Sequence, residues 1–280
     1  MRPHRLIPYA ICSLLLLVPL TGLAGTSPFL LDRQPTGQLE FSYRFQHSHF
    51  AGELGSYLDM EYHEFSLALP VSPDFVLSLS APLANWGVDS TFEPNNTTEV
   101  GNLTVGAHLM NLGAQENMSF LIALQLPTMS NDAFGDGFGM LGILAHPSVW
   151  QTFVPDVLTV QTHFTARIPA SEESFLRLEV GPDLLFPTGD NDGSTLVHMR
   201  YGLGVGVETG RLGASIEFGG FWDTDGDGDG FSENSAHMLA AGVEYVGAVV
   251  RPAVYYQIPT DDELGSFLDG VLGLRITLTP

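Results

Sequence analysis

Apolar and polar residues alternate one by one along most of the chain after residue 36. In QLEFSYRF (38–45), every second side chain is apolar and those between are polar. The same alternation returns in VLTVQTHFTARI (157–168) and LGLRITLT (272–279). Because successive side chains of a β-strand point to opposite faces, this pattern predicts strands with one apolar and one polar face.

The alternation predicts strands that run well beyond the usual length of about 5 or 6 residues. They are expected at 36–47, 57–69, 74–83, 99–110, 117–126, 156–168, 174–186, 195–207, 211–221, 236–246, 248–258 and 269–279. Short connections at 70–73, 111–116, 169–173, 208–210 and Gly247 alternate with long ones at 48–56, 84–98, 127–155, 187–194, 222–235 and 259–268. Long strands with short turns at one end and long loops at the other are the plan of a transmembrane barrel.

The sequence therefore predicts an all-β fold, a transmembrane antiparallel up-and-down β-barrel of about 12 strands over residues 36–280. A secreted β-sandwich, whose strands also alternate, is the alternative. The one-sided loop lengths and a polar face rich in glycine and opposite charges favour the barrel. Pro182 and Pro252 fall inside predicted strands, where each removes a ladder hydrogen bond. The partly apolar region 127–155 is interpreted as a loop folded over or into the barrel mouth.

The first 24 residues have the pattern of a secretory signal peptide. Arg2 and Arg5 precede an apolar run, and cleavage is expected after Ala24. A membrane anchor is the alternative, but the run is shorter than the ~20 apolar residues of a spanning helix. With residues 25–35 as a periplasmic segment, the predicted location is the bacterial outer membrane. Because the single cysteine, Cys12, lies in the signal region, no disulfide is expected in the mature protein.

The charge balance is strongly acidic, with 32 acidic and 10 basic residues, and every basic residue is an arginine. Nucleic acid is therefore not an expected partner, because its binding depends on basic side chains at phosphates. Charged residues are nevertheless only 15% of the chain, fewer than a soluble surface usually carries. The partners that we expect are outer-membrane lipid, lipopolysaccharide and a small-molecule solute.

Most arginines fall on the polar face of the predicted strands. If the apolar face contacts lipid, these residues line the lumen. The side chains expected there are Arg44, Glu61, His163, Arg167, Arg177, Glu179, Arg200, Glu217, Glu244, Arg251 and Arg275. One interpretation is a structural ladder of arginine–carboxylate pairs, since buried charges usually pair. The other is a polar pathway for a solute.

The stretch FWDTDGDGDGFSE (221–233) has the spacing of carboxylates that begins a calcium-binding EF-hand loop. Position 12, which should be Glu, is Asn234 or Ala236 in the two available registers, and both flanks are predicted strands. We therefore interpret it as an acidic hairpin loop at the outer rim. Either the loop is simply solvated, or it binds Ca²⁺ weakly through Asp223, Asp225, Asp227, Asp229 and Glu233. No other cofactor is expected.

Catalytic motifs are weak in this sequence. His47, His49 and His63 could meet across the first hairpin as metal ligands, although solvated histidines are the commoner outcome. We find no phosphate loop, no CxxC motif and no nucleophile elbow. The chain is therefore predicted not to be an enzyme.

Three segments resemble those of a known family. EVGNLTVGAHLMNLG (99–113) resembles the GxGDxxxGxxYxL strand of outer-membrane barrels of the meta-pathway phenol-degradation type, which are akin to fatty-acid and aromatic-hydrocarbon uptake channels. ALQLPTMSND (123–132) and DLLFPTGDND (183–192) resemble that family's L-P-T-G-D strand ends. Asn102 stands in place of the motif's Asp, Met129 in place of a Gly, and the chain ends in Pro280 rather than an aromatic residue. The resemblance implies an uptake barrel.

We thus predict a monomeric outer-membrane barrel through which a small, hydrophobic or aromatic solute passes by passive or facilitated diffusion, gated by region 127–155. The alternative is a closed structural or adhesive barrel whose acidic external loops bind cations, lipopolysaccharide or a partner. A third reading, a lipid-modifying enzyme, requires a paired Ser and His at the rim.

Overall fold

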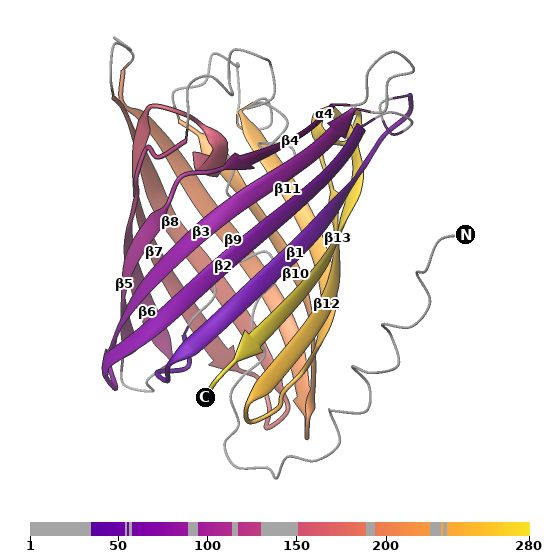
Figure 1. Ribbon diagram of the computed structural model, residues 1–280. Coiled ribbons are helices and arrows are strands. Elements are labelled where there is room, and N and C mark those ends of the chain that lie inside the picture. The colour runs from indigo at the N-terminus through magenta and orange to yellow at the C-terminus, as the bar shows by residue number, and fades with distance from the viewer. Residues whose placement is uncertain are drawn as a thin grey trace.

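The computed structural model describes residues 35–53, 55, 58–88, 95–113, 117–129, 151–188, 194–224, 231 and 234–280. These residues form a closed antiparallel barrel (Figure 1). Its strands are β1 (Glu40–Phe50), β2 (Leu58–Ser72), β3 (Phe75–Val88), β4 (Asn95–Val100), β5 (Thr104–Leu112), β6 (Met118–Gln125), β7 (Val157–Pro169), β8 (Ser174–Pro187), β9 (Leu196–Thr209), β10 (Leu212–Asp223), β11 (Ser235–Tyr245), β12 (Val250–Pro259) and β13 (Leu268–Leu278). One turn of helix, α4 (Asp262–Gly265), lies between β12 and β13.

The barrel closes where the first strand pairs with the last. Phe41 of β1 lies opposite Leu278 of β13, and Arg44 lies opposite Arg275. Elsewhere each strand pairs with its neighbours in the chain, as the up-and-down plan requires. The one exception involves β4 and β5, which pair with the two halves of β3 and so share a single position in the wall. The thirteen strands therefore form a twelve-stranded barrel, which confirms the predicted fold class.

Each predicted strand is present, with small changes at its ends. β3 extends to Val88, beyond the predicted end at 83, and β4 occupies part of the predicted loop 84–98. The predicted strand 99–110 is interrupted at 101–103, where Gly101 and Asn102 leave the ladder and bond to Pro82 and Thr152 instead. Pro182 and Pro252 both lie inside strands, as expected. None of the described residues belongs to a helix long and apolar enough to cross a membrane.

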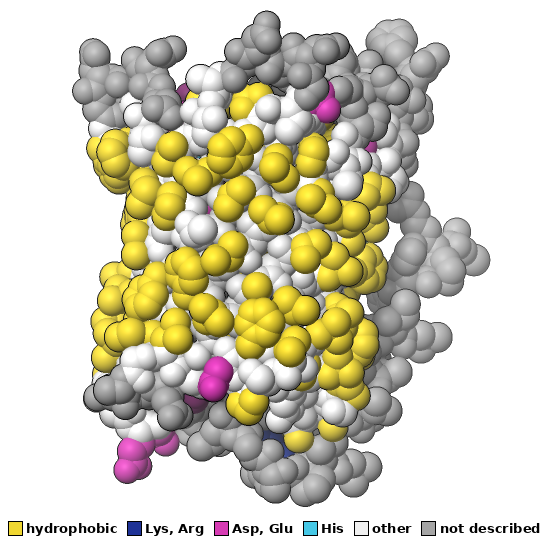
Figure 2. Space-filling model, turned by 90° about the vertical axis from the view of Figure 1, so that its left-hand side faces the viewer, with side chains coloured by type: hydrophobic (Ala, Val, Ile, Leu, Met, Phe, Trp, Pro, Cys, Tyr) yellow, Lys and Arg dark blue, Asp and Glu magenta, His cyan; other side chains and the backbone are white. Residues whose placement is uncertain are grey.

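The outward face of the barrel is apolar. Exposed outward side chains include Val205 (51%) of β9 and Ile216 (54%) of β10, which lie opposite each other, and Val243 (51%) of β11. Figure 2 shows such side chains as a belt around one side of the barrel, with acidic side chains gathered towards its two ends. An exposed apolar belt bordered by polar ends is the surface that a bilayer covers.

The inward face changes character along the barrel axis. Towards the short-turn end the inward residues are polar and charged, as Glu40, Ser42 and Arg44 illustrate on β1. Towards the long-loop end the interior holds one cluster of buried apolar side chains: Phe50, Met60, Tyr62, Ala84, Trp86, Met129, Phe153, Met238, Ala240, Ala253, Tyr255, Leu268 and Val271. We call this set the apolar cluster. The barrel thus has an apolar cluster at its long-loop end and a polar half at its short-turn end, although buried polar side chains such as Asp183 and His198 also lie towards the long loops.

Candidate functional site in the barrel lumen

The polar half of the lumen contains a buried charge cluster around Glu244 of β11. One of its carboxylate oxygens lies 3.3 Å from Arg251 of β12 and the other 3.8 Å from Arg275 of β13. All three side chains are at most 1% exposed. Period-two alternation turns these residues of three adjacent strands to the same inward face. Since removing one partner would leave an uncompensated buried charge, the cluster ties three strands together.

Further arginine–carboxylate pairs follow the wall. Arg200 of β9 lies 3.1 Å from Glu179 of β8. Arg167 of β7 lies 2.9 Å from Glu208 of β9, and its guanidinium lies 4.2 Å from the centre of the Phe175 ring. These pairs have the arrangement of a structural ladder of arginine–carboxylate pairs along the wall. The planar guanidinium of arginine suits carboxylates in a confined space.

His163 of β7 belongs to a separate buried chain of hydrogen bonds. Its Nε2 lies 2.6 Å from Oδ1 of Asp183, and Oδ2 of Asp183 accepts a 3.0 Å bond from the Gln151 side chain. Gln151 comes from the end of the long region 127–155. The strand wall therefore holds the end of that region by side-chain bonds inside the lumen.

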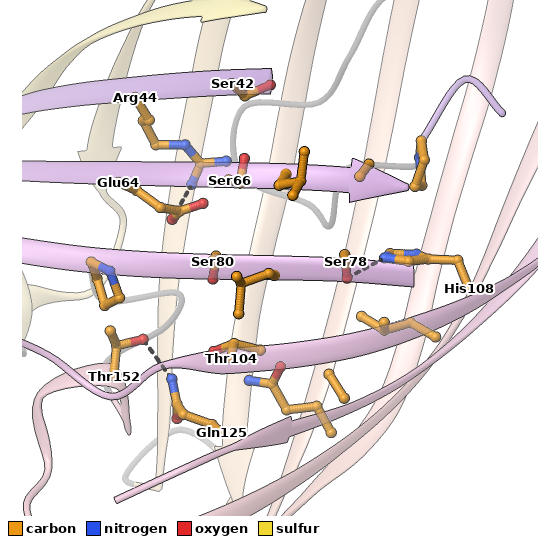
Figure 3. A pocket seen from close by; sticks show the side chains of 18 of the residues that line it. Ser42, Arg44, Glu64, Ser66, Ser78, Ser80, Thr104, His108, Gln125 and Thr152 are labelled. Carbon is orange, nitrogen blue, oxygen red and sulfur yellow. Dashed lines mark hydrogen bonds and ion pairs between the residues drawn. The ribbon is translucent and has the colours of Figure 1, made fainter. Parts of the chain in front are cut away.

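A cavity of about 170 Å³ lies in the polar half of the lumen. Small hydroxyl side chains from adjacent strands form one of its walls: Ser42, Ser66, Ser78, Ser80 and Thr104 (Figure 3). Arg44, Arg200 and Arg275 also line it. Arg44 lies 4.0 Å from Glu64, whose carboxylate also accepts a bond from Tyr62. The cavity therefore offers hydroxyl groups and guanidinium donors to a small molecule.

Asn102 anchors both described ends of region 127–155. Its side-chain oxygen accepts a 3.0 Å bond from the backbone N–H of Met129, and its amide group donates to the carbonyls of Gln151 and Val154 at 3.3 and 2.7 Å. Asp could not make the last two bonds, because an ionised carboxylate has no donor. Asn102 thus fixes both described ends of this region inside the barrel.

The described ends of region 127–155, which we call the inserted segment, lie in the lumen beside the cavity, and Thr152 lines it. Phe153 is fully buried in the apolar cluster, with its ring 5.9 Å from that of Tyr62 at an interplanar angle of 80°. Met129, at the other described end of the region, is 5% exposed in the same cluster. Thr152 accepts a 2.9 Å bond from Gln125 (Figure 3). The described parts of region 127–155 therefore enter the barrel rather than cover it from outside.

Ten of the eleven residues expected in the lumen lie on the inward face: Arg44, His163, Arg167, Arg177, Glu179, Arg200, Glu217, Glu244, Arg251 and Arg275. Glu61 does not, and this expectation needs correction. Its neighbours Met60 and Tyr62 are 1% exposed and point inward, whereas the Glu61 side chain is 41% exposed and points outward. Glu64, which lies opposite Arg44, is the carboxylate that β2 turns inward, and Glu61, three residues earlier, falls on the other face.

Of the candidate calcium ligands, only Asp223 is described, and it lies 3.6 Å from the imidazole of His198. Asp225, Asp227, Asp229 and Glu233 lie outside the described residues. The calcium site stays a prediction, as do the signal peptide 1–24 and the periplasmic segment, whose residues up to 34 also lie outside. Calorimetry with millimolar Ca²⁺ on the detergent-solubilised protein would test the calcium site.

The three histidines of the first hairpin all point outward. His63 bonds to the Tyr43 hydroxyl at 2.7 Å and to the Asn85 amide at 3.1 Å, so both of its ring nitrogens are engaged. His47 lies 3.4 Å from Asp59, and its ring contacts that of His49 edge-on. Among the described residues no three His, Cys, Asp or Glu side chains are grouped as metal ligands.

Sequence reasoning missed the residues that shape the cavity and its closure. The hydroxyl wall has a signal in the sequence, since Ser66, Ser78 and Ser80 occupy inward positions where other strands carry long side chains. Phe153 has no comparable signal, because nothing local separates a lumenal phenylalanine from a loop phenylalanine.

The sequence matches no protein-family model and no curated protein. Among solved structures, an outer membrane channel from Pseudomonas putida F1 is similar, with a TM-score of 0.62 at 15% identity over 91% of this chain and 99% of that chain. The translocator domain of autotransporter NalP from Neisseria meningitidis gives 0.53 at 10% identity over 87% and 89% of the two chains. The KdgM porin gives 0.52 at 7% identity over 86% and 99%. At these identities the likeness shows the fold, which is that of outer-membrane barrels.

Proposed function

We propose that this protein is an outer-membrane channel for passive or facilitated passage of a small, hydrophobic or aromatic solute. The observation that carries the proposal is the order of the lumen: an apolar cluster at the long-loop end followed by a cavity lined with hydroxyls and arginines at the short-turn end. In the barrel plan the short turns face the periplasm. The solute would cross the apolar cluster first and then reach hydrogen-bond donors.

The inserted segment supplies the gate in this proposal. Phe153 and Met129 stand in the apolar cluster but belong to region 127–155, not to the strand wall. Asn102 accepts a bond from the Met129 backbone, and next to Phe153 the segment is held by a bond from Gln125 to Thr152 and one from Gln151 to Asp183. Displacing a segment held by a few hydrogen bonds leaves the strand ladder intact. The lumen can therefore open without loss of the barrel.

Liposome swelling and single-channel recording of the purified mature protein test this proposal. The wild type should admit small aromatic solutes in preference to sugars of the same size. Deletion of residues 130–150 should raise conductance for both. Absence of any conductance, even after the deletion, would exclude passage.

The alternative, a closed structural or adhesive barrel, rests on the charge cluster around Glu244, which occupies part of the lumen and ties strands together. It predicts a sealed lumen in every variant of the inserted segment. Mutations in its acidic external loops, not mutations in its interior, would then change the phenotype of the cell.

A further inference from the structure

Small polar side chains form a continuous row on the inner wall of the barrel's polar half. Each of them lies directly opposite the next one on the neighbouring strand, and from β13 round to β6 the row consists of Thr277, Ser42, Ser66, Ser80, Thr104 and Gln125. All of these except Thr277 line the cavity (Figure 3). Since adjacent strands lie about 4.8 Å apart, the row sets hydrogen-bonding groups at regular steps along one wall. Most of these side chains are short, so they also leave space in front of the wall.

Charged side chains lie two positions further along β1, towards the long loops. Arg44 is directly opposite Arg275 of β13 on one side and Glu64 of β2 on the other. All three residues line the cavity. Like charges that face each other across adjacent strands are destabilising, and an anion held beside them offsets this repulsion. The arrangement of Arg44 and Arg275 therefore favours a negatively charged ligand.

The ionisable side chains that line the cavity are mostly basic: Arg44, Arg200, Arg275, Glu64 and His108. Arg200 and Arg275 have carboxylate partners, Glu179 and Glu244, whose side chains are fully buried and do not line the cavity. The Arg44 side chain is 14% exposed, compared with 7% for Arg200 and 1% for Arg275. Arg44 is therefore the guanidinium that a molecule in the cavity would contact, while Glu64 holds it from the β2 side.

The size of the cavity limits its ligand to a single ring. Its volume is about 170 Å³, and a cavity of ~150 Å³ holds one benzene molecule. Apolar groups of Tyr62, Pro82, Leu121 and Ala123 are part of the lining. An aromatic ring with one small substituent therefore fits, and a planar carboxylate is the substituent that matches the planar fork of arginine.

Two segments outside the strand ladder border the cavity. Thr152 belongs to the inserted segment, and Pro35 precedes β1. Glu40, which is 1% exposed, accepts bonds from the Thr36 backbone N–H, at 2.9 Å, and from the Thr36 hydroxyl, and so holds the segment before β1 in place. The cavity thus lies between the strand wall and these two segments, where a solute can be held during passage.

We propose that this cavity binds a solute with one aromatic ring and one carboxylate. The carboxylate accepts bonds from the guanidinium of Arg44, and the ring lies against Tyr62 and Leu121. The hydroxyl row binds polar substituents of the ring. This inference rests on the proposed function, because it names the class of solute that the lumen selects.

Titration of the detergent-solubilised mature protein with fluorinated aromatics, followed by ¹⁹F NMR, tests the class of solute. 4-Fluorobenzoate should bind about tenfold more tightly than 4-fluorobenzamide, which has the same shape but no charge, because bonds between charged groups are stronger than neutral ones. 4-Fluorobenzylamine, which carries a positive charge, should bind most weakly. Equal binding of 4-fluorobenzoate and 4-fluorobenzamide would overturn the proposal.

Two variants locate the site. Arg44→Gln should remove the preference for 4-fluorobenzoate and leave binding of 4-fluorobenzamide unchanged, whereas Ser66→Leu, which fills the cavity, should weaken both ligands. The matched control is Arg211→Gln, since Arg211 bonds to Tyr245 at the short-turn end and does not line the cavity. An unchanged preference in Arg44→Gln would contradict the assignment. If that variant fails to fold, unchanged binding in Ser66→Leu would contradict it instead.

Liposome swelling with benzoate and benzamide separates this inference from the proposed function. If neither solute enters although benzoate binds at Arg44, the channel proposal fails and the binding site stands. If both solutes enter at equal rates and bind equally, the channel stands and the carboxylate site fails. Faster entry of benzoate, lost in Arg44→Gln, would support both.

Discussion

The ring of Phe153 lies edge-on against the ring of Tyr62, 5.9 Å away, within the apolar cluster inside the barrel. Tyr62 belongs to the strand wall, whereas Phe153 belongs to the inserted end of region 127–155. The contact therefore joins a fixed element to a segment outside the strand ladder. It is one of the contacts that hold the inserted segment in the apolar cluster.

Replacement of Phe153 by Ala should widen the lumen without unfolding the barrel. Because Phe153 is not part of a strand, the loss in unfolding free energy should be smaller than the about 3–5 kcal/mol of a typical buried Phe→Ala change. Single-channel recording should show a higher conductance. Phe164→Ala, on the outward face of β7, is the matched control and should leave conductance unchanged.

Replacement of Asn102 by Asp should release the inserted segment. The carbonyls of Gln151 and Val154 would lose their donor, and each unsatisfied buried group costs about 1–3 kcal/mol. Limited proteolysis with chymotrypsin should cleave region 127–155 faster in the variant than in the wild type. Asn117→Asp, at the short-turn end, should not change the rate; equal rates in Asn102→Asp and wild type would contradict the anchoring role.

Replacement of Glu244 by Gln should destabilise the barrel strongly. It leaves Arg251 and Arg275 without the shared carboxylate in a site at most 1% exposed, and breaking a buried pair costs about 3–5 kcal/mol. Urea unfolding of the detergent-solubilised protein measures this loss. Glu172→Gln in the exposed β7–β8 turn is the control, expected to stay within about 0.5 kcal/mol.

An arginine on the lipid-facing belt should be costly where one in the lumen is tolerated. Val205→Arg places a charge among exposed apolar neighbours and should cost about 2–4 kcal/mol if it lies near the bilayer midplane. Ser80→Arg, at the edge of the cavity, should cost less because hydroxyls and Glu64 surround it. Folding yields into lipid vesicles across a urea series compare the two; a reversed order would contradict the assigned faces.

The strands were predictable because alternation is a local property. In β13 the pattern Leu272, Leu274 and Ile276 against Gly273, Arg275 and Thr277 needs no knowledge of the rest of the chain. The closure of the barrel and the burial of Arg275 then follow from the need to pair every strand edge. This is why the fold and the faces of most charged residues could be inferred.

Features that depend on strand register or on contacts between distant segments could not be inferred. Glu61 was assigned to the wrong face because its surroundings, MEYHE (60–64), carry polar residues on both faces of β2. The bond between Tyr201 and His237 crosses a whole strand and depends on Gly220, which local patterns do not connect to either residue. Phe153 lies in the lumen through bonds that Asn102 makes 49 to 52 residues away in the chain.

The central claim is that the alternating apolar side chains contact lipid and the arginine-bearing face encloses the lumen. Nitroxide labels placed one at a time from Tyr201 to Val207 on β9, in the mature protein reconstituted in vesicles, test it by their accessibility to oxygen and to a water-soluble nickel complex. Labels at 201, 203, 205 and 207 should be accessible to oxygen. Labels at 202, 204 and 206, on the inward face, should be less accessible to oxygen than these four. Uniform exposure to the nickel complex, or the opposite alternation, would contradict the account.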